Sequence, residues 1–357
     1  MAMEMTGQGG EGTNNIPNDD VPITSNGTGP GTITFDWNNS GVTLFQAFTA
    51  SLGRASDTSL LPKNFVLKRY RPRSCDIVRN KCLRQGQNYE DDLCEHKWRL
   101  LLDTGESGSK YFLSANEDFI IKTIQDSEHN CLNDILPRLC HFLTDNPQTL
   151  LPRFFGLYRY TGGGKKIRFM VMNNLLPNHL QIDKRFDLKG ATKRKTATNV
   201  GKDDEFLKTH PNGFEMDERY VTRLRELLEL DCMHLRELGL TNYSLFIAVH
   251  EVDKDDEDED DHIRVSNENL DEHSRSSQTL GLLGYRSRGV PARLCATSKV
   301  LLYIGIIHIL KPYTLRNKEE YLFKSMLPGG DDTPVQPPKE FEERFMRFVR
   351  DIWFKPQ

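Results

Sequence analysis

The 357-residue chain is long enough for two lobes with a buried core, and its 37% hydrophobic and 27% charged residues are ordinary for a globular protein. Seven cysteines without a C-x-x-C pair argue against a disulfide framework and a structural zinc site, and they indicate a reducing, cytoplasmic compartment. The polar N-terminus shows no apolar signal region. The longest apolar stretch, 300–310, is about half of the roughly 20 residues that a membrane span requires, so we expect any membrane contact to be peripheral.

The net charge of −4 is unevenly distributed along the chain. Residues 251–262 hold nine acidic residues and one lysine and carry −8, which leaves the rest of the chain at +4. A mildly basic body with one acidic segment is compatible with binding an anionic surface. We expect 251–290 to be a disordered acidic insert and 1–34 a disordered tail, because both lack an apolar period.

The hydrophobic periods predict an α+β protein. In chain order they predict a helix at 41–52, a helix at 91–102, a hairpin of 110–113 with 119–124, a helix from 126 to 143, a hairpin of 156–160 with 167–172, a helix at 215–238, strands at 244–250 and 300–310, and a helix at 340–353. Strands early and helices later indicate two lobes, an N-terminal lobe at 35–174 and a C-terminal lobe at 175–357.

A glycine-containing turn lies upstream of an unusual lysine. The run GESGS at 105–109 leads into the first predicted strand, and glycine there lets backbone amides approach phosphate oxygens. Lys122 follows among apolar residues on a strand, where a buried ammonium needs an anionic partner. Kinases provide nucleotide phosphates and a helix glutamate, for which Glu128 is the candidate. An ordinary turn and a lysine on an exposed edge strand are the alternatives.

Two further segments are compatible with a nucleotide site. Met172 and Asn173 end the last strand before the lobes change, where a linker would present backbone groups to an adenine ring; an Asn-Asn turn is equally compatible. The segment 185–195 gathers basic residues around the single carboxylate of Asp187, which suits a phosphate-binding patch or a solvated loop.

Several motifs together resemble those of the phosphatidylinositol phosphate kinases. FDLKG at 186–190 resembles their D-L-K-G-S signature, and MNN at 172–174 resembles their hinge. The other similar runs are TLLPRFFGLY at 149–158, SGS at 107–109, IIKT at 120–123, GVPAR at 289–293 and YIGII at 303–307. The similarity extends in order from about residue 36 to the C-terminus, and it is closest to the 4-phosphate 5-kinases.

The resemblance implies a two-lobed fold distantly related to protein kinases, with antiparallel sheets in both lobes, and transfer of phosphate from ATP with Mg²⁺ to an inositol ring. It makes Lys122 the nucleotide-phosphate lysine, held by Glu128. Among the other family positions are the phosphate loop of Ser107, Gly108 and Ser109, the hinge of Met172 and Asn173, and the catalytic-centre residues Asp187 and Lys189.

The resemblance also implies a flat basic face against a phosphoinositide membrane, on the inner face of the plasma membrane. A specificity loop would lie at about 311–338, where Lys318, Glu320 and Lys324 match family positions. Glu320 is the residue type of the 4-phosphate 5-kinases. With Lys189, the basic residues Arg194 and Lys195 would complete the substrate and membrane contacts.

Four positions depart from the family pattern, two of them at catalytic aspartates. The catalytic-loop aspartate of M-D-Y-S-L-L is Asn242 here, and the metal-holding aspartate of I-I-D is His308. Ala191 replaces the serine of the signature, and Lys195 replaces its customary arginine. Imidazole is a poor substitute for the oxygen ligands that Mg²⁺ prefers, so no metal ligand is predicted with His308 at that position.

Two hypotheses follow. In the first, the protein is a catalytically impaired relative, a pseudokinase, that binds phosphoinositide membranes and acts as a scaffold, alone as a dimer or with an active kinase of the family. In the second, it is an active phosphatidylinositol 4-phosphate 5-kinase that holds its metal through other groups. The family pattern accounts for the 193–195 cluster, so no nucleic-acid partner is expected.

Overall fold

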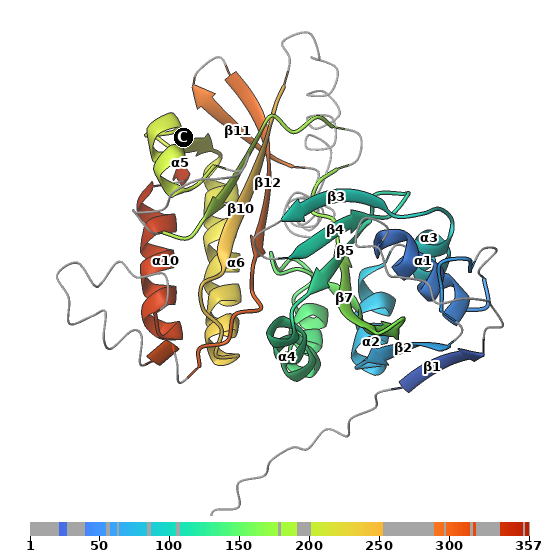
Figure 1. Cartoon of the computed structure of the whole chain (residues 1–357). Coiled ribbons are helices and arrows are strands. Elements are labelled where there is room, and N and C mark those ends of the chain that lie inside the picture. The colour runs from blue at the N-terminus through green and yellow to red at the C-terminus, as the bar shows by residue number, and fades with distance from the viewer. Residues whose placement is uncertain are drawn as a thin grey trace, which may run out of the picture.

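The computed structural model describes two β-sheets with helices packed around them (Figure 1). The described residues are 21–26, 40–54, 58–62, 64–83, 87–104, 108–177, 180–190, 201–252, 289–295, 298–314, 317–318, 336–352 and 354–356. Within this part of the chain the fold is the predicted α+β arrangement in two lobes, each built on one sheet.

The N-terminal lobe contains a seven-stranded antiparallel sheet in the order β1-β2-β6-β7-β5-β4-β3. Its elements are β1 (Val21–Asn26), α1 (Ser40–Ser51), β2 (Asn64–Tyr70), α2 (Pro72–Cys82), α3 (Tyr89–Cys94), β3 (Arg99–Thr104), β4 (Ser109–Leu113), β5 (Phe119–Ile124), α4 (Asp126–Asp145), β6 (Phe154–Gly162) and β7 (Lys165–Asn173). The two predicted hairpins are present as β4–β5 and β6–β7, and α4 follows the first of them as predicted.

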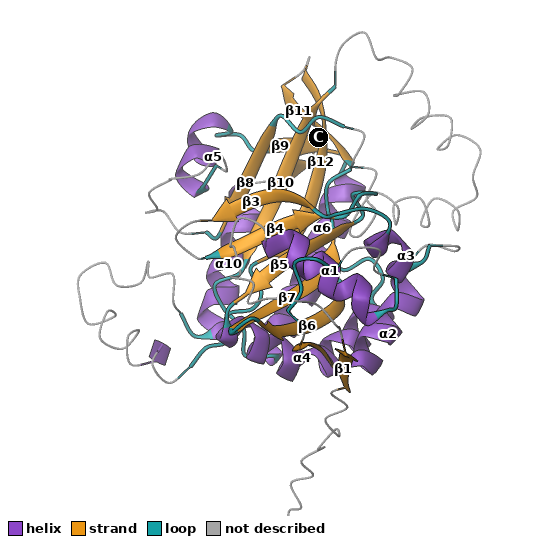
Figure 2. Ribbon diagram, turned by 45° about the vertical axis from the view of Figure 1, so that its right-hand side comes forward, coloured by secondary structure: helices purple, strands orange, loops and turns teal. Residues whose placement is uncertain are grey.

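The C-terminal lobe contains a six-stranded sheet in the order β13-β9-β11-β12-β10-β8. Its elements are β8 (Lys184–Leu188), α5 (Asp203–Thr209), β9 (Phe214–Met216), α6 (Glu218–Glu237), β10 (Ser244–Glu251), β11 (Val290–Cys295), β12 (Ser298–Ile307), α10 (Pro338–Ile352) and β13 (Phe354–Pro356). Its pairs are antiparallel except β13 with β9, which is parallel. The long helices α6 and α10 run side by side along this sheet (Figure 1). Figure 2 shows its strands β8, β10, β12 and β11 in front of these helices.

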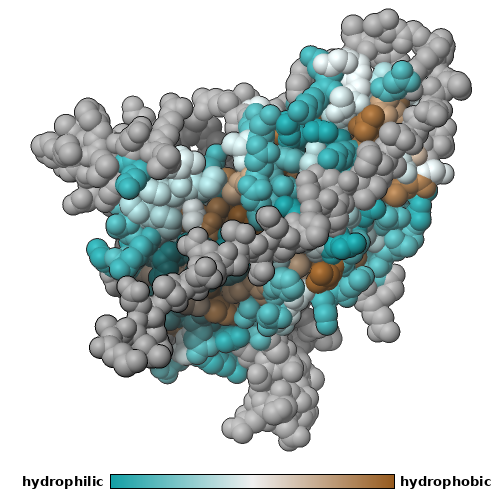
Figure 3. Space-filling view, turned by 90° about the horizontal axis from the view of Figure 1, so that it is seen from below, coloured by the Kyte–Doolittle hydropathy of each residue, from teal (hydrophilic) through white to brown (hydrophobic). Residues whose placement is uncertain are grey.

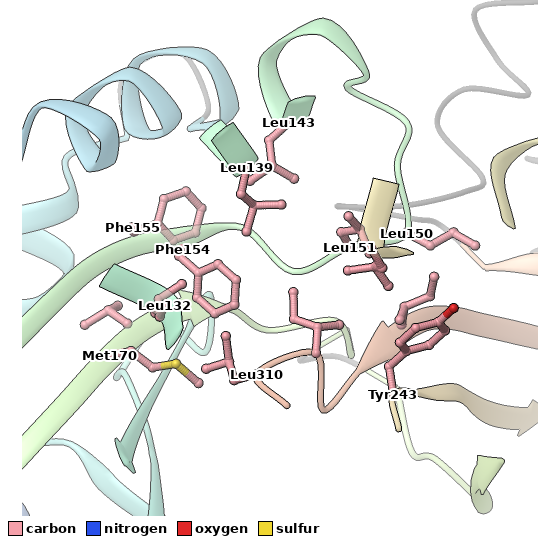
Figure 4. Close-up of a cluster of buried hydrophobic side chains, with 14 of the residues drawn as sticks. Leu132, Leu139, Leu143, Leu150, Leu151, Phe154, Phe155, Met170, Tyr243 and Leu310 are labelled. Carbon is pink, nitrogen blue, oxygen red and sulfur yellow. The ribbon is translucent and has the colours of Figure 1, made fainter. Parts of the chain in front are cut away.

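One continuous hydrophobic core passes from lobe to lobe. Where the lobes meet, α4, the strands β6 and β7, and the segments around 150 and 310 bring large apolar side chains together (Figure 4). The labelled members are Leu132, Leu139, Leu143, Leu150, Leu151, Phe154, Phe155, Met170, Tyr243 and Leu310. Burial of this shared apolar surface holds the two lobes in a fixed relation, which places the residues between them.

Three element predictions are wrong in part. The predicted helix at 91–102 is instead α3 followed by β3, because 99–104 pairs antiparallel with β4 and tertiary pairing outweighs a local helical period. The predicted helix at 215–238 begins later, since Phe214–Met216 is strand β9 and the Asp217 side chain caps α6 by accepting from the Arg219 amide. The strand predicted to end at 310 ends at Ile307.

The predicted disordered segments are described only at their edges. Val21–Asn26 is a strand on the edge of the first sheet, paired antiparallel with β2, so the tail prediction is wrong for these residues. Glu251 belongs to β10 and Val290 to β11, which shortens the predicted insert at both ends. The rest of 1–34, and 253–288, lie outside the described residues.

Among the described helices, none is long and apolar enough to cross a membrane. The face in Figure 3 is mainly hydrophilic, with small separate hydrophobic areas. Large hydrophobic side chains that are exposed in the described parts are Ile77, Leu100, Leu101 and Met233.

Candidate active site

The predicted lysine and its candidate glutamate form an ion pair. Lys122 lies on β5 and Glu128 on the first turn of α4, and Lys122 Nζ is 2.8 Å from Glu128 Oε1. The other carboxylate oxygen of Glu128 accepts from the Gln125 amide, which fixes its position at the helix start. Burial disfavours the Lys122 charge, but Tyr111 and Glu128 outweigh this and raise the pKa of Lys122. Lys122 is therefore a fixed, charged ammonium between the lobes.

The glycine turn connects two strands rather than leading into the first one. It lies between β3 and β4. Because the sequence predicted no strand at 99–104, the turn was expected before the first strand. Gly108 has a positive φ of 64°, a conformation that glycine adopts without strain, and Ser109 begins β4 as a buried residue. Ser107 lies outside the described residues. In the described half of the predicted loop, Gly108 thus adopts a backbone conformation that favours glycine.

The predicted hinge residues end β7. Asn173 is buried, and its Oδ1 accepts from the Arg153 amide at 2.8 Å while its own amide donates to the Arg153 carbonyl at 3.2 Å. Met172 pairs with Ile120 and Phe154 in the sheet. The Asn173 side chain therefore closes the end of β7 against the chain before β6, which fixes the strand at the border of the lobes.

Lys189 and Asn242 meet at the ends of β8 and β10. Lys189 Nζ donates to the Asn242 carbonyl at 2.6 Å and to Asn242 Oδ1 at 3.0 Å. Asn242 has a φ of 60°, in the left-handed region that asparagine, aspartate and histidine tolerate better than most residues. The predicted catalytic-loop position thus lies directly against the signature lysine.

Asp187 and His308 form the second half of the centre. His308 follows the last residue of β12, also has a φ of 60°, and places Nε2 3.8 Å from Asp187 Oδ2. Asp187 is buried and makes an ion pair with Lys202. Burial would raise the pKa of Asp187, but the imidazole of His308, which is protonated at the low pH where Asp187 titrates, and the Lys202 ammonium outweigh this and hold the pKa below its usual range.

The electrostatic surroundings keep His308 neutral. Burial and the ammonium groups of Lys189, Lys122 and Lys202 lower the pKa of His308, and Asp187 offsets part of this. The centre therefore contains a neutral imidazole and a neutral amide where the family pattern has two carboxylates.

Two residues of the centre were not predicted. Lys202 reaches Asp187 because Gly201 returns to β8, where its amide donates to the Arg185 carbonyl at 2.8 Å. Asp203 is fully buried, and its Oδ1 accepts from the amides of Lys189 and Gly190 at 3.0 and 2.8 Å. Neither contact has a local sequence signal, because both join residues 13 to 15 positions apart through a fold-back.

The predicted membrane residues are only partly described. Lys318 is exposed, and its amide donates to the Thr314 carbonyl at 3.0 Å. Arg194, Lys195, Glu320 and Lys324 lie outside the described residues. The structure therefore brings the predicted site residues together as three pairs, Lys122 with Glu128, Lys189 with Asn242, and Asp187 with His308. It leaves Lys318 on the surface near the start of the predicted specificity loop.

The described residues do not fit a resident divalent metal ion. No group of three or more His, Cys, Asp or Glu side chains in this part of the chain could hold one. Asp187 and His308 lie close together, but the Asp187 carboxylate is already paired with Lys202. Mg²⁺ prefers several oxygen ligands, and each carboxylate of this centre is already engaged: Asp187 by Lys202, Glu128 by Lys122, and Asp203 by the amides of Lys189 and Gly190.

Comparison with known proteins decides the family. The family described as Phosphatidylinositol-4-phosphate 5-Kinase matches residues 92–352. The chain belongs to the phosphatidylinositol-4-phosphate 5-kinase family. The mouse (Mus musculus) phosphatidylinositol 4-phosphate 5-kinase type-1 alpha is 33% identical over 317 residues, which cover 82% of this chain and 58% of the relative. The mouse type-1 beta protein is 32% identical over 320 residues, covering 82% and 59%.

A relative from a bird is similar to the chain to nearly the same extent. The chicken (Gallus gallus) type-1 beta protein is 30% identical over 325 residues, which cover 82% of this chain and 59% of the relative. The chain thus spans somewhat under two thirds of the length of these phosphatidylinositol-4-phosphate 5-kinases. The predicted family and its resemblance to the type-1 enzymes are confirmed.

Proposed function

We propose that this member of the phosphatidylinositol-4-phosphate 5-kinase family is impaired in phosphate transfer and binds phosphoinositide membranes as a scaffold. One observation carries the first half of the proposal. Asn242 and His308 lie against Lys189 and Asp187, at the centre where the family pattern has two carboxylates, and neither side chain supplies one. Phosphoryl transfer depends on positioning and on neutralising phosphate charge with metal ions, so a centre without metal ligands is impaired.

The proposed membrane binding rests on the charge of the chain and on the names of its relatives. Outside its acidic segment the chain carries +4, and Lys318 is an exposed cation in the predicted specificity loop. Such residues bind anionic lipid whether or not the centre is active. The relatives are named as kinases of phosphatidylinositol 4-phosphate, which makes that lipid the first to test. The proposed location is the inner face of the plasma membrane, with a second copy or an active family kinase as partner.

An active 5-kinase is the alternative, favoured by the intact pair of Lys122 and Glu128. That pair is the arrangement by which kinases hold nucleotide phosphates, and ATP with Mg²⁺ would then be the cofactors. The two functions differ in one readout, which is labelled product formed on liposomes that contain phosphatidylinositol 4-phosphate. We expect wild-type protein to sediment with these liposomes and to form no more product than a Lys122→Met variant; product above that control supports the active kinase.

Charge reversal in the specificity loop tests the membrane half. We expect Lys318→Glu combined with Lys324→Glu to weaken liposome binding at least about tenfold at low salt, since each basic residue near an anionic surface contributes on the order of 1 kcal/mol. Co-sedimentation over a range of lipid concentrations measures the effect. Lys165→Glu combined with Lys166→Glu is the matched control, because both residues are exposed on β7 and the charge change is the same. Equal binding by the two double variants would contradict a specific role for the loop.

A further inference from the structure

The charged groups of the centre are balanced without a metal ion. The ammonium groups are those of Lys122, Lys189 and Lys202. Lys122 contacts Glu128, Lys202 contacts Asp187, and Lys189 donates to the neutral Asn242. The remaining carboxylate, Asp203, accepts from the backbone amides of the Lys189 loop. Within this set, three positive charges therefore stand against three negative ones, and Lys311, which lowers the pKa of Glu128, adds positive charge nearby.

The family pattern would give this centre a different charge. Two more carboxylates, at positions 242 and 308, would leave the same set of groups at −2, the charge that a single divalent cation cancels. Asn242 and His308 carry no negative charge in any protonation state. The excess negative charge that would attract a divalent cation is therefore absent from the described residues, and no group of three potential ligands replaces it.

The position of Lys202 further distinguishes this centre from the metal-binding centre of the family pattern. Its Nζ lies on Asp187, the carboxylate next to the metal position of the family, and both side chains are largely buried, with 18% and 9% exposed. A lysine held there is a point charge beside the same carboxylate that a metal ion would use. Lys202 contacts Asp187, which also lies 3.8 Å from His308, and Lys189 follows Asp187 by two positions in the chain and contacts Asn242. These contacts gather ammonium groups around one centre, and Lys122 is held by Glu128 near enough to lower the pKa of His308, so one polyphosphate can contact all three.

We propose that this centre binds the phosphates of a nucleotide as a metal-free anion, held by Lys122, Lys189 and Lys202, and that a divalent cation weakens this binding. The inference rests on the same two substitutions as the proposed function. Mg²⁺ on the phosphates reduces their charge and brings a dication toward an ammonium group that already occupies the nearby carboxylate. Lys202 is thereby a nucleotide-binding residue that has no counterpart among the predicted site residues.

The experiment is a calorimetric titration of the full chain with ATP, in EDTA and in Mg²⁺. We expect the Kd in EDTA to be lower than in Mg²⁺ by at least about threefold. Lys202→Gln should weaken metal-free binding about tenfold, as the loss of one charge-assisted contact predicts, and Lys202→Arg should retain it. Lys184→Gln is the matched control, because Lys184 makes an exposed ion pair with Glu251 elsewhere in the sheet. Inorganic triphosphate in place of ATP measures the contribution of the phosphates alone.

His308→Asp reverses the expected metal dependence, because it adds a carboxylate beside Asp187 and so favours ATP with Mg²⁺ over ATP in EDTA. Thermal unfolding of each variant without ligand verifies that it is folded. ATP binding that requires Mg²⁺ in the wild type, no binding in EDTA, or equal binding by Lys202→Gln would each overturn the inference. A different measurement tests the proposed function. Formation of labelled lipid product would contradict it, whereas the affinity for ATP in EDTA would not.

Discussion

Aspartate at both 242 and 308 is expected to raise Mg²⁺-dependent transfer of phosphate to phosphatidylinositol 4-phosphate by at least about 100-fold over the wild type, since a general base alone contributes about 10²- to 10⁴-fold. His308→Asp would add an oxygen ligand next to Asp187, and Asn242→Asp would place a carboxylate against Lys189. Each single variant should gain less than the pair, because a base without a metal ion and a metal ion without a base both leave the transfer step incomplete.

The local backbone suits these substitutions. Both positions have a φ of 60°, and aspartate is one of the few residue types that adopt this region readily. In the Asn242→Asp variant, a carboxylate oxygen would keep the contact that Asn242 Oδ1 now makes with Lys189 Nζ. The control is the same double variant with Lys122→Met, which removes the phosphate-binding lysine. A folded double variant with no more activity than the wild type would show that the loss of function extends beyond these two side chains.

Replacing Asp231 is expected to destabilise the fold by about 3 kcal/mol, because it leaves buried polar groups without an acceptor. Asp231 lies on α6 in the C-terminal lobe and is fully buried. It accepts from the Thr149 hydroxyl and, at 2.8 Å, from the Leu150 amide. The Leu150 carbonyl in turn accepts from the Ile306 amide at 2.9 Å, so this carboxyl group fixes the chain between the lobes.

Burial also gives Asp231 a predictable pH dependence. It raises the pKa of Asp231 to about 7, and the contacts with Thr149, Leu150 and Arg153 offset only part of this. A carboxyl group whose pKa is higher in the folded than in the unfolded state binds more protons when folded, so its contribution to stability falls as the pH rises from about 4 to about 7. Relative to Asp231→Asn, the wild type should lose up to about 1.4 kcal/mol per pH unit across this range.

Urea unfolding of the wild type and of Asp231→Ala at pH 5, where Asp231 is mostly protonated in the folded state, measures the first effect. Wild type against Asp231→Asn at pH 5 and pH 7 measures the second. Glu226→Gln is the control, because Glu226 lies on the same helix with 56% of its side chain exposed and pairs only one turn away with Arg223. A difference between wild type and Asp231→Asn that stays constant from pH 5 to pH 7 would contradict the raised pKa.

Local contacts of the site were predictable from the sequence. Lys122 among apolar residues required an anionic partner, and Glu128 lay six positions away at a helix start, so a single turn of chain brings the two together. The two hairpins were also predictable from the sequence, because a glycine or polar turn separates two apolar runs in each. Motif order then placed Asn242 and His308 at the centre, and the structure finds both against signature residues.

Contacts between distant segments were not predictable in this way. Lys202 meets Asp187 through a fold-back, and Asp231 meets Thr149 from 82 positions away; each depends on how the lobes pack. The wrong helix at 91–102 has the same cause, since its second half is held as a strand by β4. The six-residue strand β1 was not predicted, because its own sequence shows no hydrophobic period. It is a strand because it pairs with β2.

The most direct measurement is transfer of labelled phosphate from ATP to liposomes containing phosphatidylinositol 4-phosphate, with Mg²⁺ and with Mn²⁺, by the wild-type protein and by Lys122→Met. The centre described here, with Asn242 and His308 in place of carboxylates and Lys202 on Asp187, predicts no product above the Lys122→Met level with either metal, from protein that still sediments with the liposomes. Product above that level would contradict it and would establish an active kinase with a metal site of a different kind.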